Sequence, residues 1–184
     1  AGSGIIHEEM PQQSSPGVHG LQLWVNLPAR EKMRDPAYRG ITAGEVPVVP
    51  TGSGTVKVLA GEWGGARGPV IGVARSPVYL DIELHPQASI LLDVPGSRTA
   101  FCYILVGSVL VGSAGEVHAA GSCVLLGTGD EVRFTAGPEG CRLILVHAPP
   151  IKEPISWGGP IVMNTREELD LAFRELDAGT FIKV

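Results

Sequence analysis

The sequence has 184 residues, 44% of them hydrophobic and 18% charged, with a formal net charge of −5. A chain of this length and composition can bury a sizeable core, which excludes an intrinsically disordered protein or a disulfide-dependent miniprotein. Its 14 Lys and Arg are scattered among 19 Asp and Glu, which argues against direct nucleic-acid binding. The longest nearly apolar run, Phe101 to Val111, is too short to span a membrane. We therefore expect a soluble protein with no nucleic-acid or membrane partner.

The first predicted element is an extended stretch from Ile5 to Glu9. Alternate side chains of an extended chain share a face, so His7 and Glu9 would point the same way and Glu8 the other way. An imidazole and a carboxylate at this spacing can bind one divalent cation. These donors suit non-haem iron, with manganese, nickel, copper and zinc as alternatives. A surface histidine beside a solvated acid has the same spacing, so spacing alone leaves both interpretations open.

The next segment combines an apolar run, a short helix and a linker. Leu21 to Leu27 is typical of a strand, and Pro28 to Asp35 predicts a helix that Pro36 ends after about two turns. Between Tyr38 and Gly54, frequent Gly and Pro residues are typical of an interdomain linker. The stretch before this linker is too short for a separate β domain. We therefore expect the chain to be the C-terminal part of a longer, two-domain protein.

The segment after the linker contains short runs rich in Val, Ile, Leu and Tyr, most of them bounded by Gly or Pro turns. Such runs predict β-strands. Many short strands with Gly-rich turns favour an all-β sandwich or barrel, in particular a double-sheet jelly roll. The predicted strands are Val56–Ala60, Val78–Leu84, Phe101–Val106, Val109–Val111, Cys123–Leu126, Val132–Thr135 and Leu143–His147.

The last predicted element is an amphipathic helix near the C-terminus. Thr165 and Glu168 are spaced as a capping box that begins the helix, and Gly179 ends it. We expect its apolar stripe to pack on the outside of the barrel. The stripe consists of Leu169, Ala172, Phe173 and Leu176.

The cysteines and the remaining histidines form no second group of candidate site residues. Cys102, Cys123 and Cys141 stand among apolar residues and are interpreted as small buried side chains; an odd number cannot form a closed set of disulfides. Without a signal-peptide pattern, this favours a reducing compartment, the cytoplasm or, in a eukaryote, the nucleus. The sequence has no phosphate-binding, dinucleotide-binding, hydrolase or Cys-x-x-Cys motif. No second ligand at strand spacing accompanies His19, His85, His118 or His147.

Three longer strings carry a family resemblance that covers essentially the whole chain. They are Gly2-Ser-Gly-Ile-Ile-His7-Glu-Glu9-Met-Pro11, His19-Gly-Leu-Gln-Leu-Trp-Val-Asn-Leu27 and Gly159-Pro160-Ile-Val-Met-Asn-Thr-Arg-Glu-Glu168. Together with Lys32-Met33, Pro36 and Tyr38, these strings resemble the pirin family of the cupin superfamily. The resemblance implies a bicupin, in which two β-barrels face each other and the N-terminal barrel holds an iron-type metal through three His and one Glu.

Two of these four ligands carry over onto this chain, as His7 and Glu9. The other two, a His-x-His pair from an earlier strand, have no counterpart, which implies weak or absent metal binding by this chain alone. Around Gly96 to Gly107, apolar residues stand where a metal-bearing cupin would place histidines. The implied domains are 1–45, the end of the N-terminal metal-binding cupin; 46–163, a metal-free C-terminal cupin; and 164–184, a helix and tail.

The resemblance also implies two alternative functions. Some pirins are similar in activity to quercetin 2,3-dioxygenase, which implies a flavonol-like substrate, Glu9 as a catalytic proton acceptor and His7 as a neutral nitrogen ligand. Other pirins are described as iron-dependent regulatory proteins that bind a protein partner. The sequence does not decide between them. Because Leu21, Leu23, Val25 and Leu27 would face a barrel whose earlier strands are missing, we also expect an oligomer or association with an N-terminal segment.

Overall fold

The computed structural model describes residues 2–10, 17–113 and 115–183, and its contacts divide the chain into two compact units. One unit, Gly40–Pro150, is called the barrel unit here. The other, called the terminal unit, combines Ala1–Arg39 with Ile151–Val184. The three-part division expected from the sequence, at 45/46 and 163/164, stays a prediction. No helix in the described part of the chain is long and apolar enough to cross a membrane.

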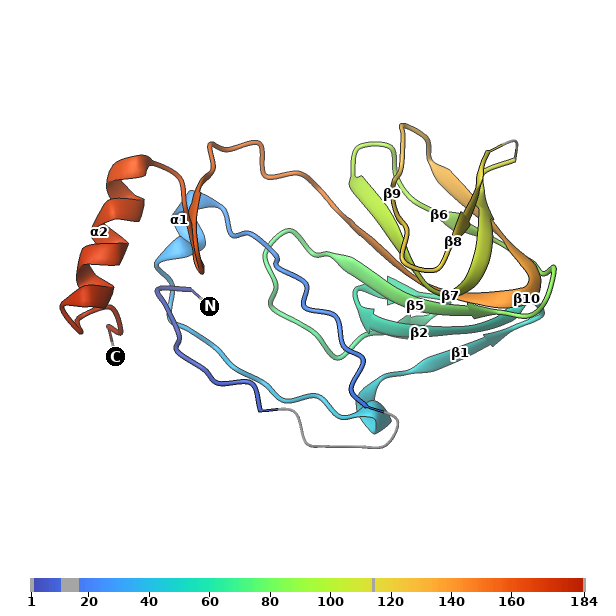
Figure 1. Ribbon diagram of the computed structural model, residues 1–184, viewed down its shortest axis with the longest axis horizontal. Coiled ribbons are helices and arrows are strands. Elements are labelled where there is room, and N and C mark those ends of the chain that lie inside the picture. Colours follow the sequence, from blue (N-terminus) through green and yellow to red (C-terminus); the bar gives the residue numbers. More distant parts are fainter. Residues whose placement is uncertain (1, 11–16, 114, 184) are drawn as a thin grey trace. The chain divides into compact units, whose positions relative to one another are not determined.

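The barrel unit is built on one antiparallel sheet of eight strands (Figure 1). Its main order is β1-β2-β5-β10-β7-β8, with β6 paired to β10 and β9 paired to β7. The sheet strands are β1 (Val48–Thr51), β2 (Gly54–Ala60), β5 (Val78–Leu84), β6 (Ser89–Asp93), β7 (Thr99–Val111), β8 (Val117–Ala119), β9 (Cys123–Leu125) and β10 (Glu131–Ala148). The unit also contains the 3₁₀ turn η1 (Ala43–Glu45) and a small hairpin of β3 (Glu62–Trp63) and β4 (Ala66–Arg67).

The two longest strands, β7 and β10, bend together and fold the sheet over on itself. The first half of β10 pairs with β6 and the end of β7, and its second half pairs with β5 and the start of β7. Between these halves the register shifts from Ala136 to Cys141. Gly107 and Gly140 have φ values of +73° and +80°, and a Cβ on Gly107 would collide with the Gly140 carbonyl oxygen. The bend therefore requires glycine.

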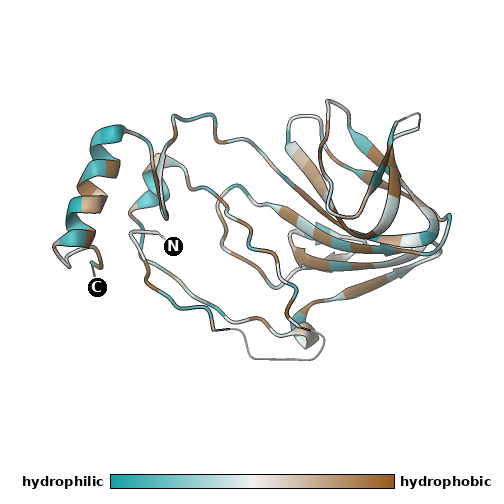
Figure 2. Cartoon of the chain, in the orientation of Figure 1, coloured by the Kyte–Doolittle hydropathy of each residue, from teal (hydrophilic) through white to brown (hydrophobic). Residues whose placement is uncertain are grey.

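The core lies between the two halves of this folded sheet. Alternate residues of the strands point into it, as the pleat of a β-strand requires. Figure 2 shows apolar residues recurring along these strands. Fully or nearly fully buried core residues include Val56, Val58, Leu80, Ile82, Leu92, Cys102, Ile104, Val109, Phe134, Leu143 and Leu145.

These strands confirm the predicted all-β barrel and extend several predicted elements. The predicted runs 101–106 and 109–111 are one strand, β7, and the runs 132–135 and 143–147 both belong to β10. Strands β1, β6 and β8 of this sheet were not predicted. The prediction of a strand at Leu21–Leu27 is wrong, because these residues form no strand in the structure. A strand needs a hydrogen-bonding neighbour, and apolar composition alone does not provide one.

The terminal unit contains helix α1 (Ala29–Lys32), the hairpin of β11 (Ser156–Gly158) and β12 (Ile161–Met163), and helix α2 (Arg166–Asp177). Helix α2 begins as predicted: Thr165 Oγ1 accepts from the Glu168 amide at 3.2 Å, and Glu168 Oε2 accepts from the Thr165 amide at 3.0 Å. It ends as predicted at Gly179, which has φ of +70° and donates to the Leu176 carbonyl.

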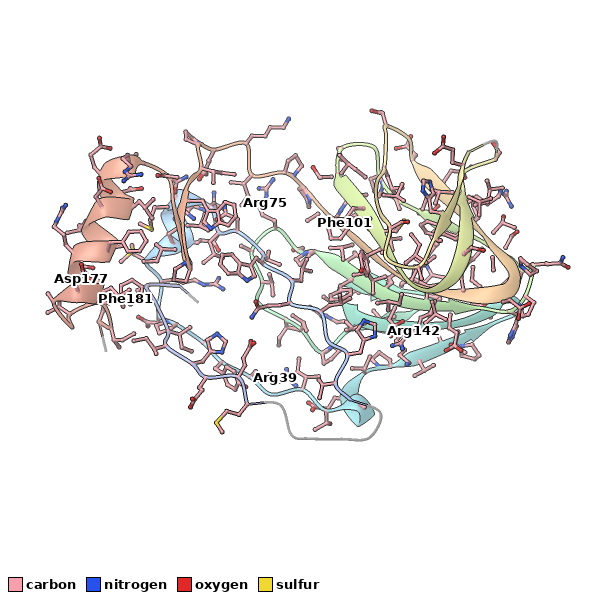
Figure 3. The ribbon with its side chains drawn as sticks, viewed as in Figure 1. Arg39, Arg75, Phe101, Arg142, Asp177 and Phe181 are labelled. Atoms are coloured by element: carbon pink, nitrogen blue, oxygen red, sulfur yellow. The ribbon has the colours of Figure 1, made fainter. Side chains whose placement is uncertain are left out.

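The apolar side of α2 packs on the β11–β12 hairpin. The expectation that this helix lies on the outside of the barrel stays a prediction. Leu169 and Ala172 are buried against Ile161 of β12. Phe181, beyond the helix, folds back on this cluster (Figure 3). The helix and the hairpin therefore form a second, small core within the terminal unit.

A buried lysine joins the two stretches of the terminal unit. Lys32, at the end of α1, is 6% exposed, and its Nζ donates to Asn26 Oδ1 at 2.7 Å and to the Val162 carbonyl at 3.0 Å. Burial lowers the pKa of Lys32, while the carboxylates of Glu153 and Glu168 act in the opposite direction. The Lys32–Val162 hydrogen bond spans 130 positions in sequence and ties α1 to β12.

Replacing this lysine tests whether the bond holds the unit together. We expect Lys32→Met to lower the free energy of unfolding by about 1–3 kcal/mol, because Asn26 Oδ1 and the Val162 carbonyl would lose a buried donor. Hydrogen exchange should locate the loss in β12 and the first turn of α2. Arg30→Met, on the exposed side of the same helix, is the matched control and should change little. Equal effects of the two variants would contradict this role for Lys32.

Candidate functional site

The predicted metal ligands lie on a coil segment that is fixed at its start. The Ser3 amide donates to the Arg34 carbonyl oxygen at 2.8 Å. Gly4 has φ of +136°, and a Cβ at this position would lie 2.5 Å from the ring of Phe181. Only glycine fits so close a contact in this backbone conformation. The segment that continues to His7 and Glu9 is therefore anchored to both stretches of the terminal unit.

His7 and Glu9 are both exposed, and their segment forms no strand. Glu9 Oε1 accepts a hydrogen bond from Gln22 Nε2 at 2.8 Å, and Gln22 Oε1 accepts one from Trp24 Nε1 at 3.4 Å. The structure thus brings Glu9 to the segment around Gln22. Within residues 2–10, 17–113 and 115–183, no three His, Cys, Asp or Glu side chains lie close enough together to hold a metal ion. The assignment of His7 and Glu9 as metal ligands stays a prediction.

The segment around Gln22 exposes several apolar side chains. Leu21, Leu23 and Val25 are each more than one third exposed, and Trp24 is 55% exposed. Because Gln22 bonds to Glu9, the position of these side chains is coupled to the carboxylate of the predicted metal pair.

A second polar site, at the end of β10, was not identified from the sequence. His147 is 6% exposed and projects from the same face of the strand as Leu143 and Leu145. Its Nδ1 is buried without a hydrogen-bond partner. Arg98 Nη2 donates to the His147 carbonyl at 3.4 Å and to the Ser76 carbonyl at 2.6 Å. Burial, and secondarily the charge of Arg98, lowers the pKa of His147 to about 4.

The cysteines follow the sequence prediction at two positions of three. Cys102 and Cys141 are buried, and Cys123 is exposed, which corrects the expectation that all three are buried. Burial raises the pKa of Cys102 to about 12 and that of Cys141 to about 11. These two thiols are therefore protonated and unreactive at neutral pH. Cys123 differs because it points away from the core on the short strand β9.

Comparison with known proteins agrees with this fold. The family model of the pirin C-terminal cupin domain matches residues 79–182. This chain belongs to the pirin family. A pirin-like protein of Caulobacter vibrioides is 41% identical over 183 residues, which cover 98% of this chain and 65% of that relative. Human pirin is 38% identical over 176 residues, which cover 94% of this chain and 60% of that relative.

One solved structure is similar to this chain over most of its length. A crystal structure of quercetin 2,3-dioxygenase from Acinetobacter baumannii superposes with a TM-score of 0.78 and 29% identity, covering 86% of this chain and 55% of that one. The fold is thus the mostly-β cupin fold, with a C-terminal helix. The chain spans less than two thirds of the length of either pirin relative.

The interior of the barrel unit is apolar around Gly96 to Gly107, the stretch where a metal-bearing cupin would place histidines. Within Gly96 to Gly107, the residues that face the core are Ala100, Cys102 and Ile104, each at most 4% exposed. Phe101 and Tyr103 alternate with them and project from the opposite face of β7. This part of the barrel therefore contributes hydrophobic packing to the pirin fold.

The buried histidine predicts a specific loss of stability in acid. The unfolded chain protonates its histidine near pH 6.5, whereas the folded protein protonates His147 only near pH 4. Acid therefore favours the unfolded chain, and the free energy of unfolding falls as the pH drops from 6.5 towards 4. Between about pH 7 and about pH 5 we expect His147 to account for roughly 2 kcal/mol of lost stability.

Urea unfolding of the wild type and of His147→Gln at both pH values measures this contribution. The variant should lose less stability on acidification than the wild type, because glutamine does not titrate. His85→Gln, in an exposed turn, is the control and should retain the full acid sensitivity. An identical pH dependence in the wild type and in His147→Gln would contradict the assignment.

Proposed function

We propose that His7 and Glu9 are two ligands of a catalytic metal ion, iron in the first place, in a pirin that oxidises flavonols as a quercetin 2,3-dioxygenase does. The observation that carries the proposal is the pair itself. It supplies an imidazole nitrogen and a carboxylate oxygen, both exposed, on a segment anchored through Ser3 and Gly4. The name of the similar Acinetobacter structure supports the reaction class.

The donor set suits the proposed metal. Nitrogen and oxygen donors are the ligands of non-haem iron, and manganese, nickel, copper and zinc accept them as well. Two donors do not complete a coordination sphere, so further ligands would come from outside the residues that the structure describes. This chain by itself should therefore bind metal weakly.

The metal, when bound, would supply Lewis acidity that makes a flavonol hydroxyl more acidic and a coordination position for the substrate. Glu9 would accept the hydroxyl proton, because its carboxylate is the basic oxygen group of the pair. His7 would hold its place as a neutral nitrogen donor. Gln22, which donates to Glu9 Oε1 at 2.8 Å, would orient the carboxylate and leave Oε2 for the proton or the metal.

Substitution of Glu9 tests the reaction. In the complete, iron-loaded protein, we expect Glu9→Ala to lower flavonol turnover by roughly 10²-fold or more, because the proton acceptor and a ligand are lost together. The assay follows flavonol absorbance and the stoichiometric release of carbon monoxide. Glu8→Ala is the matched control, since Glu8 is an adjacent exposed carboxylate with no assigned role. Turnover no faster than that of free iron, or equal losses in both variants, would refute the enzymatic proposal.

A second function, metal-dependent regulation through a protein partner, is favoured by the exposed apolar segment next to Glu9. Leu21, Leu23 and Val25 are exposed, and the segment bonds to Glu9 through Gln22. A metal bound at Glu9 Oε2 would shift the carboxylate that Gln22 holds through Oε1, and so change how the apolar side chains are presented. Exposed apolar side chains in one segment are typical of a contact surface.

The same segment predicts association of the chain in solution. We expect light scattering to detect a species larger than the 19.3 kDa monomer, because Leu21, Leu23 and Val25 gain buried area on contact. Replacing Leu21 and Val25 by Ser should shift the chain towards the monomer. Val117→Ser, at an exposed apolar position on β8, is the control. A monodisperse monomer for the wild type would contradict the prediction.

A further inference from the structure

An arginine with uncompensated charge lies at one end of the barrel unit. Arg98 Nη2 donates to the carbonyl oxygens of Ser76 and His147, whereas its Nε is buried and has no hydrogen-bond partner. Burial alone lowers the pKa of Arg98, with no carboxylate acting in the opposite direction. A partly buried guanidinium without a counter-ion is costly unless an anion compensates it.

Another arginine of the same unit, Arg142, has the carboxylate partner that Arg98 lacks within the described ranges. Arg142, on β10, donates from Nε to Asp81 Oδ1 at 2.9 Å and from Nη2 to Asp81 Oδ2 at 2.6 Å. Figure 3 labels its side chain over the sheet. This two-pronged contact raises the pKa of Arg142. Among the residues that the structure describes, Arg98 has only carbonyl oxygens as partners.

His147 presents the second unsatisfied atom at the same place. The ring is almost fully buried, its Nδ1 has no partner, and the Arg98 charge acts on it electrostatically. A neutral imidazole can carry its proton on Nδ1 and then donate a hydrogen bond. Arg98 Nε–H and His147 Nδ1–H would then be two buried donors at one end of the core.

The loop that faces these residues is held in a strained conformation. Arg75 and Ser76 have φ values of +67° and +42°, which non-glycine residues rarely adopt. Arg98 fixes the loop through the Ser76 carbonyl, and Arg75 donates from Nη2 to the Pro150 carbonyl at 2.9 Å (Figure 3). Strain of this kind concentrates at binding sites. Arg75 is exposed and adds a second positive charge to the same corner.

We propose that Arg98 and His147 form a binding site for a small oxyanion, a carboxylate or a phosphate, with Arg75 at its rim. Arg98 Nε and His147 Nδ1 are both buried, so the anion would reach these donors only after a local shift of the loop that carries Arg75 and Ser76; its negative charge would then compensate the guanidinium. Carboxylates and phosphates share this chemistry, because both present oxygens that match arginine donors. The site lies wholly within the barrel unit and does not depend on the proposed metal pair.

Nuclear magnetic resonance of the full chain tests the proposal with two probes, acetate and inorganic phosphate, titrated separately at constant pH and ionic strength. We expect saturable shifts of the His147 ring and of the Arg98 Nε–H resonance with at least one probe. The stronger response distinguishes a carboxylate site from a phosphate site. This wild-type measurement does not depend on whether any variant folds.

Variants then separate a site from a general effect of charge. Arg98→Met should weaken binding roughly tenfold or more, since a hydrogen bond to a charged group is lost. His147→Gln, which leaves the Ser76 contact of Arg98 in place, should weaken it as well. Arg133→Met, an exposed arginine on β10, should have no effect. His7→Ala should also leave anion binding unchanged, so that failure of the metal proposal and of this one can be told apart.

Three outcomes would overturn the proposal. The His147 and Arg98 resonances could stay unchanged with both probes, in which case a buried water or nothing satisfies the two nitrogen atoms. The shifts could be linear in concentration and shared by the exposed His85, which would indicate non-specific screening. They could also be saturable but equal in Arg98→Met and the wild type, which would place the anion elsewhere.

Discussion

The paired bend of β7 and β10 is the constraint on which the barrel depends. Every other sheet strand except β1 and β2 pairs directly with one of these two strands. The bend needs positive φ at Gly107 and Gly140, and it leaves no room for a Cβ between them. Because both strands turn at the same place, their halves can close over one core. The bend also sets the register that carries Thr99 beside Ala148 at the far end.

That register places the polar end of the barrel. The register sets His147 opposite Ala100, two positions after Arg98, and Arg98 Nη2 reaches the His147 carbonyl, so two residues 49 positions apart become neighbours. His147 lies on the face of β10 that carries core residues, and Arg98 directly precedes β7; Arg98 Nε and His147 Nδ1 are both buried at this end of the sheet. The pairing that sets Leu145 opposite Cys102 therefore leaves two buried polar atoms, Arg98 Nε and His147 Nδ1, at the end of the same core.

Elements with local signals could be predicted from the sequence, and elements set by distant contacts could not. Helix α2 has its cap residues, apolar stripe and terminating glycine within a single stretch, and its bounds agree with the prediction. The segment at 21–27 has a strand-like composition, but strand formation depends on a partner that composition does not show. The burial of Lys32 depends on Val162, far away in the sequence. The orphaned atoms of Arg98 and His147 likewise have no local signature.

The barrel interior around Cys102 is a poor environment for metal binding or nucleophilic chemistry, for a physical reason. Inside, Cys102 is surrounded by apolar side chains such as Ile104 and Leu145, and burial raises its pKa to about 12. A thiol binds metal or attacks a substrate as the thiolate, which this environment disfavours. The imidazole and carboxylate of His7 and Glu9 are in the opposite situation, because exposure leaves their donor atoms accessible. An apolar interior therefore stabilises the barrel, and the metal pair that we propose lies on exposed residues of the terminal unit.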